Sequence, residues 1–290
     1  PMARHLNVPL VVTFHGYDVM MKDAYAARSF YLHRKYLKRR PVLAREGTLF
    51  IAVSRYIRDL LLAQGFPDER IAVHYIGVDV RLFTPAPEIQ RRPVVLFVGR
   101  LSPEKGCDYL IRAMAEVQAA RPEAELVVIG AGAERSRLES MARTTLRRYQ
   151  FLGVLPQPEI KAWLNRARVF CVPSLRIENG EGEAFGLVFA EAQAMGVPVV
   201  SFASGGIPEA VAHGSTGFLS PERDWRGLAG HIIDLLGNDV LWHRMSRSGR
   251  ERVTRQFDLV AQTRALEDLY RGALDATRGQ SLEPRLSATT

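Results

Sequence analysis

Cysteine and long hydrophobic runs are the two features that this chain of 290 residues has least of. It contains only Cys107 and Cys171, which lack metal-ligand spacing and are too few for a disulfide framework. We therefore expect both cysteines to be buried apolar residues in a reducing, cytoplasmic setting. No apolar run approaches the roughly 20 residues that span a bilayer, and the first residues do not read as a signal peptide. We expect the chain not to cross a membrane by itself.

Acidic residues are also in the minority, with 31 Asp and Glu against 39 Lys and Arg, so that the formal net charge is +8. Such a charge favours anionic partners, which are nucleic acid, anionic lipid or phosphorylated small molecules. No nucleic-acid-binding module is recognisable, and basic and aromatic residues do not interleave as they do in single-strand binders. We therefore predict no nucleic-acid partner. The length and the hydrophobic fraction of 47% suit two globular α/β domains.

The first apolar segment, residues 9–14, predicts a buried parallel strand that ends in His15 and Gly16. A histidine at the carboxyl end of such a strand lies where open α/β sheets hold their ligands, and the glycine beside it leaves room for close approach. A purely structural histidine is the competing interpretation. Further strands are predicted over residues 48–53 and 70–75, with a helix capped by Ser54 between them.

A basic helical pattern covers residues 24–40 between the first two strands. Its basic side chains are Arg28, His33, Arg34, Lys35, Lys38, Arg39 and Arg40. A solvated helix face is the ordinary interpretation of such a run. The alternative is contact with anionic lipid headgroups, where each basic residue adds about 1 kcal/mol. We hypothesise peripheral contact with the inner face of the cell membrane.

Proline density marks a linker before residue 94, and a continuous apolar strand then ends at Gly99. Arg100 and Lys105 follow on the loop that leads into the next helix. Arginine offers forked donors and lysine a mobile point charge, which is what a diphosphate needs. Solvated residues of a surface loop are the competing interpretation.

A second glycine-bearing turn follows the strand at residues 125–129, where Gly130 and Gly132 stand. The pair invites a dinucleotide-binding interpretation, but Arg135 replaces the small residue that this fingerprint needs. An NAD enzyme is therefore disfavoured. We expect the two glycines to let the backbone approach a nucleotide.

The stretch over residues 173–200 combines an apolar strand end, a polar glycine-bearing loop, an alanine-rich helical pattern from about Gly186, and a stop at Gly196. This order places a helix N-terminus, with its unpaired amides and positive dipole end, at the carboxyl edge of a sheet, which suits phosphate. Glu183 stands before the first turn and Glu191 two turns further on. Two carboxylates beside a phosphate site suggest hydroxyl recognition.

Taken in order along nearly the whole chain, these strings resemble the retaining GT-B glycosyltransferases of the large fourth family, also called group 1, in their bacterial polysaccharide type. The strings are Thr-Phe-His-Gly-Tyr-Asp at 13–18, Gly-Arg-x-x-x-x-Lys-Gly at 99–106, Phe-Leu-Gly-Val-Leu-Pro at 151–156, Glu-x7-Glu at 183–191 and Gly-Gly-x-x-Glu at 205–209.

The resemblance implies an α/β fold of the GT-B type, with two Rossmann-like domains and a cleft between them. We expect a partial acceptor-side domain over residues 1–85 and a nucleotide-sugar-binding domain over 86–257. A helix over 258–278 should return to the first domain, and a disordered tail should follow over 279–290. Only eight residues precede the first predicted strand, so the first domain is expected to be N-terminally incomplete.

The implied activity is metal-independent transfer of a sugar from a UDP- or GDP-sugar to the hydroxyl of a carbohydrate or lipid-linked acceptor, in bacterial exopolysaccharide or glycolipid synthesis. No cofactor is implied, because the sugar nucleotide is a co-substrate. The implied catalytic residues are His15, Arg100, Lys105 and Glu183. The implied donor-binding residues are Gly16, Gly99, Gly130, Gly132, Val154, Leu155, Phe185, Gly186, Leu187 and Glu191. A non-catalytic nucleotide-sugar-binding fragment and a GT-B sugar-nucleotide epimerase remain as alternatives.

Overall fold

The computed structural model describes residues 2–29 and 31–280, and the chain forms two compact units. The first unit consists of Pro1–Tyr75 together with Val260–Thr290, and the second is Ile76–Leu259. The tail predicted to be disordered lies, from residue 281 onwards, outside the described residues.

A three-stranded parallel sheet forms the centre of the first unit, in the order β1 (Val11–Phe14), β2 (Leu49–Ala52) and β3 (Ile71–Val73). Val11 pairs with Leu49 and Phe50 with Ile71. The rings of Phe14, Phe50 and Phe66 pack against one another with centroids 4.8 to 6.3 Å apart. This aromatic cluster lies in the core of the unit, and β1, β2 and β3 confirm the strands predicted over residues 9–14, 48–53 and 70–75.

The helices of the first unit are α1 (Met2–Leu6), α2 (Tyr17–Met20), α3 (Asp23–Ala26), α4 (Tyr31–Glu46) and α5 (Arg55–Ala63), followed by the 3-10 turn η1 (Asp68–Arg70). Ser54 caps α5 as predicted, because its Oγ accepts a hydrogen bond of 3.2 Å from the amide of Ile57.

The single basic helix predicted over residues 24–40 is wrong in two respects. The segment forms two helices, α3 and α4, and α4 continues through Pro41 to Glu46. Proline normally ends a helix because it lacks an amide donor and crowds the preceding turn. Here the last turn is held by burial of Ala44 and by a hydrogen bond of 2.8 Å from the amide of Gly47 to the carbonyl of Leu43. Packing of this turn outweighs the local preference.

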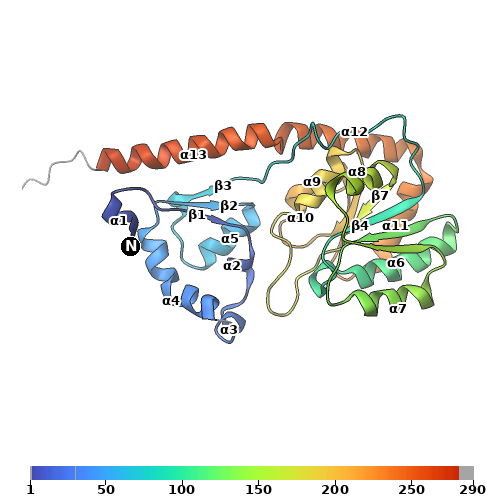
Figure 1. Ribbon diagram of the computed structural model, residues 1–290, viewed down its shortest axis with the longest axis horizontal. Helices are drawn as coiled ribbons and strands as arrows, with labels where there is room; N and C mark the ends of the chain where they lie inside the picture. The colour runs from blue at the N-terminus through green and yellow to red at the C-terminus, as the bar shows by residue number, and fades with distance from the viewer. Residues whose placement is uncertain (1, 30, 281–290) are drawn as a thin grey trace, which may run out of the picture. The chain divides into compact units, whose positions relative to one another are not determined.

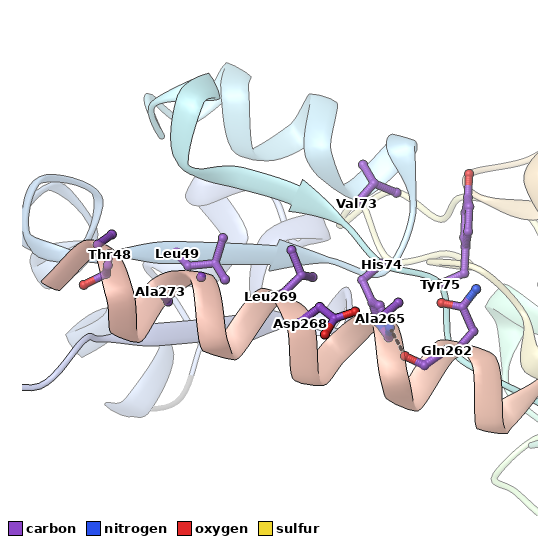
Figure 2. Close-up of a pocket in the computed structure, with 12 residues that line it drawn as sticks. Thr48, Leu49, Val73, His74, Tyr75, Gln262, Ala265, Asp268, Leu269 and Ala273 are labelled. Carbon is purple, nitrogen blue, oxygen red and sulfur yellow. Dashed lines mark hydrogen bonds between the residues drawn. The ribbon is translucent and has the colours of Figure 1, made fainter. Parts of the chain in front are cut away.

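The last helix, α13 (Leu259–Gln280), belongs to the first unit from Val260 onwards. It runs beside β2 and β3, and the Nε2 atom of His74 lies 2.8 Å from the carbonyl oxygen of Gln262 (Figure 2). A largely apolar hollow between the helix and the strands is lined by Leu49, Val73 and Leu269 among others. Within the described residues, no helix is both long enough and apolar enough to cross a membrane.

The second unit contains a six-stranded parallel sheet in the order β6-β5-β4-β7-β8-β9. The strands are β4 (Val94–Val98), β5 (Glu125–Ile129), β6 (Tyr149–Gly153), β7 (Val169–Cys171), β8 (Val199–Phe202) and β9 (Gly217–Ser220). The chain moves outwards from β4 in one direction and then from β7 in the other, so the order reverses between these two neighbours. Open α/β sheets bind ligands at such a switch point.

Helices cover both faces of this sheet (Figure 1). They are α6 (Cys107–Ala120), α7 (Arg135–Thr145), α8 (Gln157–Arg166), α9 (Leu187–Ala194), α10 (Ile207–Ala210), α11 (Trp225–Gly237) and α12 (Asp239–Gln256), with the 3-10 turn η2 (Pro103–Lys105) before α6. α6 packs with α7 and α11, while α9 packs with α12. Because both faces are covered, β4 and β5 are almost wholly buried apolar strands, as their sequences predict.

The division between the units lies after Tyr75, whereas the proline-rich string predicted it after residue 85. Val78 and Phe83 are buried, and the amide of Val78 donates to the carbonyl of Phe257 at 2.7 Å. The amide of Leu259 donates back to the carbonyl of Val78 at 2.9 Å. These contacts tie the first residues of the predicted linker into the second unit.

Candidate active site

The loops that follow β4 and β7 face each other at the switch point of the second unit. Because β4 and β7 are parallel neighbours, their carboxyl ends lie at the same edge of the sheet. The first loop carries Arg100 and Lys105, and the second carries Ser174 and Glu183. The predicted site residues on these two loops therefore lie close together.

Lys105 and Glu183 form an ion pair across this point, with Nζ and Oε2 2.6 Å apart. The two side chains are only 17% and 13% exposed, so water screens the pair less than it would on the surface. The hydroxyl of Ser174, which is buried, also reaches Oε2 of Glu183 at 3.4 Å. The pair presents a cation and a carboxylate to any ligand at this edge.

Glu104 organises the loop after β4 and was missed by the sequence analysis. Its carboxylate is buried and accepts hydrogen bonds from Ser102 Oγ at 2.5 Å and from Arg100 Nη2 at 3.1 Å. The carbonyl of Glu104 also accepts the amide of Leu175 at 2.9 Å, which joins the two loops. An acidic residue four positions after Arg100 was the available signal. Arg100 itself is 76% exposed, so its guanidinium is free to meet a ligand on its outer side.

Gly106 lets these two loops touch. Its φ is +64°, and a Cβ atom there would lie 2.1 Å from the carbonyl oxygen of Pro173. Only glycine combines this left-handed backbone with so close an approach. The glycine therefore sets the distance across which Lys105 reaches Glu183.

Helix α9 begins beside Glu183. Its N-cap is Gly186, which provides no side-chain cap, and Leu187 is its first residue. Phe185 is buried and packs edge-on against Phe257, with the ring centroids 5.1 Å apart. This anchor holds the first turn of α9 at the carboxyl edge, where the amides of a helix start attract anions.

Glu191 lies further along α9 and is partly buried. Burial raises the pKa of its carboxyl group from 4.5 to about 7. Near neutral pH the carboxyl group is therefore a mixture of the charged and the protonated form. Such a group accepts or donates a hydrogen bond, which suits a hydroxyl-bearing ligand.

Gly130 and Gly132 have a packing role that the sequence analysis did not foresee. A Cβ atom on Gly130 would lie 1.9 Å from the carbonyl oxygen of Gly99, and one on Gly132 would lie 2.2 Å from that of Leu101. The amide of Leu101 donates to the carbonyl of Ala131 at 2.9 Å. The glycines thus let the turn after β5 pack against the loop after β4. Their contact with a nucleotide stays a prediction.

Val154 and Leu155 follow β6, so they share the carboxyl edge with the other loops. Val154 is 77% exposed, while Leu155 is half-buried. An exposed valine in this position is available for contact with a flat ring. Its contact with a nucleobase stays a prediction.

His15 and Gly16 belong to the first unit, where they follow β1 as predicted. The His15 side chain is exposed. The amide of Gly16 donates to Asp18 Oδ1 at 3.1 Å. Burial raises the pKa of Asp18, against the opposing effects of backbone hydrogen bonds and of His15. Asp18 thus supports the turn that presents His15, and it does so from the first turn of α2 instead of its N-cap.

Among the described residues, no three His, Cys, Asp or Glu side chains are grouped so that they could hold a metal ion. The independence from metal that the resemblance implies stays a prediction.

Comparison with known proteins gives two family matches. The profile described as "Glycosyl transferases group 1" matches residues 82–252, and that described as "Glycosyltransferase Family 4" matches residues 1–82. The chain therefore belongs to the group 1 glycosyl transferases.

Individual relatives agree with this assignment. The chain is 32% identical to a glycogen synthase of Mycobacterium tuberculosis, over 98% of this chain and 68% of the relative. It is 37% identical to a GDP-mannose-dependent monoacylated alpha-(1-6)-phosphatidylinositol monomannoside mannosyltransferase of Corynebacterium glutamicum, over 61% of this chain and 50% of the relative. Among these and similar curated glycosyltransferases, the chain spans between 50% and 74% of the relative's length.

A solved structure shares the fold. The Anabaena protein Alr3699/HepE in complex with UDP-glucose is 22% identical, with a TM-score of 0.79 over 93% of this chain and 74% of that one. The parallel sheets and this likeness confirm the predicted α/β fold of the GT-B class.

Proposed function

We propose that this chain is the donor-binding part of a retaining, metal-independent glycosyltransferase that moves a sugar from a nucleotide diphosphate sugar to an acceptor hydroxyl. The observation that carries the proposal is the Lys105–Glu183 pair at the switch point, beside the start of α9. One cation and a helix N-terminus suit a diphosphate, and a carboxylate next to them suits sugar hydroxyls.

The difficult step is the departure of the nucleoside diphosphate, because negative charge grows on its phosphate oxygens. Arg100, Lys105 and the amides of residues 185–187 would stabilise this charge, and preorganised donors of this kind are worth about 3 kcal/mol each. The bond from the sugar carbon to the phosphate oxygen breaks, and the acceptor oxygen bonds to that carbon on the same face. This attack on the same face retains the configuration, and the acceptor proton passes to the leaving phosphate.

The other roles follow the resemblance. Glu183 would hold the hydroxyls of the donor sugar, and Glu191 would bind the ribose. The backbone at Val154 and Leu155 would meet the base, with Gly16, Gly99, Gly130 and Gly132 shaping the surface. His15, in the first unit, is proposed to contact the donor sugar.

Names of similar proteins support a UDP- or GDP-sugar as the donor. One relative is named as GDP-mannose-dependent, and the Anabaena structure is a complex with UDP-glucose. The names of two relatives also point to a polysaccharide and a glycolipid as products. We propose a carbohydrate or lipid-linked acceptor in bacterial exopolysaccharide or glycolipid synthesis, at the cytoplasmic side of the membrane.

The test is calorimetry of the purified chain with a panel of UDP- and GDP-sugars. An assay for released nucleoside diphosphate follows, with and without a lipid-linked acceptor. Binding with acceptor-dependent release supports the proposal, and Lys105→Ala should weaken both. Lys161→Ala, a lysine change on α8 of the same unit, is the matched control. Binding without any release indicates a binding fragment, conversion of the donor to an isomeric sugar nucleotide indicates an epimerase, and no binding at all refutes the proposal.

We also propose that α4 contacts an anionic membrane surface. Arg34, Lys38 and Arg39 are exposed on it, together with Tyr31 and Leu32, whereas Arg40 is paired with Asp23 at 2.6 Å. Liposomes containing phosphatidylserine should pull down the wild-type protein, and Arg34→Glu with Lys38→Glu should reduce this binding. Arg143→Glu with Arg147→Glu, an equal charge change on exposed residues of the second unit, should not. Binding that is independent of anionic lipid would exclude the idea.

A further inference from the structure

A second concave surface of the second unit lies at the opposite edge of its sheet from the candidate active site. It is a hollow of about 770 Å³ between α12 and the chain before β4 and β8. Arg91 stands before β4 and Gly196 before β8, and both line it. Because all strands are parallel, these positions mark the amino edge. A ligand here would not overlap one bound between the loops after β4 and β7.

The lining of this hollow is rich in basic side chains. One face of α12 contributes His243, Arg247, Arg250 and Arg255, and Arg91 joins them from outside the helix. The spacing of four and three residues between the first three places their side chains on the same side of the helix. Glu251 is the acidic residue among the lining residues. The surface therefore carries a clear excess of positive charge.

The two inner guanidinium groups are already fixed in place. Arg91 donates to the carbonyl oxygens of Leu164 at 2.7 Å, Ala167 at 2.8 Å and Met195 at 2.6 Å. Arg250 donates to the carbonyls of Phe83, at 3.0 Å, and Ala194. Apart from Phe83, these partners lie at or near the C-terminal ends of α8 and α9, so helix-end carbonyls hold both side chains.

Carbonyl groups satisfy the donors of these two arginines without cancelling their charge. Burial, and secondarily the nearby Arg168, lowers the pKa of Arg91 to about 10, which leaves it protonated at neutral pH. Arg168 has its own counterion, because its guanidinium pairs with Asp239. No carboxylate pairs with Arg91 or Arg250 in the described part of the chain.

The outer guanidinium groups are available to a ligand. Arg247 and Arg255 are exposed, and neither makes an ion pair or a side-chain hydrogen bond within the residues that the structure describes. Two inner guanidinium groups held by backbone carbonyls and two exposed outer ones thus line a space of the size that small-molecule sites have. Ser246 and Thr254 add hydroxyl groups to the lining.

We propose that this hollow binds a phosphorylated small molecule of the size of a hexose phosphate. A phosphate monoester carries close to two negative charges and several acceptor oxygens, which match forked guanidinium donors better than a single carboxylate does. The concave shape and limited volume fit a small molecule, whereas nucleic acid and membranes need an extended surface. This inference is independent of the proposed transferase activity, because it concerns the other edge of the sheet.

The test is calorimetry of the purified chain with glucose 6-phosphate at constant ionic strength, with glucose as the uncharged control. The variant is Arg247→Ala with Arg255→Ala, and both of these exposed side chains should be removable without unfolding the protein. A thermal melt of the variant checks this. Arg244→Ala is the matched control, because Arg244 is exposed on the same helix and does not line the hollow. Lys105→Ala tests whether the phosphate binds instead at the candidate active site, at the opposite edge of the sheet.

Saturable binding of glucose 6-phosphate but not of glucose is expected, and the double variant should weaken it at least tenfold. Arg244→Ala and Lys105→Ala should bind like the wild type. No binding by the wild type, undiminished binding by the folded double variant, or an equal loss in Arg244→Ala would each overturn the proposal. Loss of binding in Lys105→Ala would also overturn it, because the phosphate would then sit between the loops after β4 and β7.

Discussion

Lys105 and Glu183 are 78 positions apart in the sequence, yet their Nζ and Oε2 atoms are 2.6 Å apart. The contact joins the loops after two neighbouring strands at the point where the strand order reverses. Each group is therefore the counterion of the other in the absence of ligand. A phosphate that binds Lys105 must compete with this carboxylate.

This competition predicts that two substitutions differ in their effect on nucleotide binding. Lys105→Ala should weaken binding of the preferred nucleoside diphosphate, UDP or GDP, about 10- to 100-fold, because a charge-assisted hydrogen bond is lost. Glu183→Gln should bind the same diphosphate as tightly as the wild type or more tightly, because Lys105 is released. Titration calorimetry at one ionic strength measures both.

The same variant tests the role of Glu183 toward the sugar. If its carboxylate holds sugar hydroxyls, the wild type should bind the sugar nucleotide more tightly than the nucleoside diphosphate. In Glu183→Gln most of this difference in affinity should be lost. An unchanged gain would contradict that role while leaving the role of Lys105 intact.

A second prediction concerns the pH dependence of stability. The folded-state pKa of Glu191 is about 7 against an ordinary 4.5, so the folded chain binds more protons than the unfolded chain between these values. Stability contributed by this group therefore falls as the pH rises from about 4.5 to 7, and stays low above that. Glu191→Gln removes the titration, so its melting temperature relative to the wild type should increase between pH 4 and pH 8.

Differential scanning calorimetry of the variant and the wild type at pH 4 and pH 8 measures this difference in melting temperature. Glu159→Gln, on an exposed residue of α8 in the same unit, should show the same small difference from the wild type at both. A pH-independent difference for Glu191→Gln would contradict the assigned burial effect.

Gly106 provides a third prediction. An alanine there has to adopt φ +64° and place its Cβ 2.1 Å from the carbonyl oxygen of Pro173. Backbone strain and overpacking together should cost about 3 kcal/mol of unfolding free energy. Gly214→Ala is the control, because Gly214 has φ +75° with no atom near its Cβ position, and should cost about 1 kcal/mol. Denaturant midpoints separate the two, and equal losses would show that contact with Pro173 is unimportant.

The cysteines give a fourth prediction. Cys107 and Cys171 are 2% and 0% exposed, and burial raises the pKa of both thiols. Because the thiolate is the reactive form, neither should react with a thiol-specific reagent in the native protein at pH 8. Both should react at once in guanidinium chloride. Stoichiometric labelling of the folded chain within minutes would be inconsistent with this packing.

The sequence predicted the strands and the two facing loops because apolar runs, glycines and charged strings are local signals. Residues 94–98 and 125–129 lie in the strands that their composition indicates. The Lys105–Glu183 contact was not predicted, because it depends on the strand order. β7 pairs with β4, although β5 and β6 stand between them in the sequence.

Other features were hidden because tertiary contacts override local rules. Pro41 suggests the end of a helix, but packing carries α4 on to Glu46. The lack of a side chain at Gly130 seemed to serve a ligand, yet the carbonyl of Gly99 already occupies that space. The proline-rich string after Tyr75 resembled a free linker, yet Val78 pairs with Phe257. Gly99 and Phe257 are distant in sequence from the residues that they contact, Gly130 and Val78.

Helix α9 has only eight residues, so about 12 Å separates the start that Gly186 caps from the end whose Ala194 carbonyl Arg250 binds. The guanidinium of Arg250 at the last carbonyls offsets the negative, C-terminal end of the helix dipole. The positive, N-terminal end faces the carboxyl edge of the sheet. Truncating Arg250 would therefore fray the far end of the element on which Glu191 stands. Such a change could lower affinity for a donor without altering any atom that touches it.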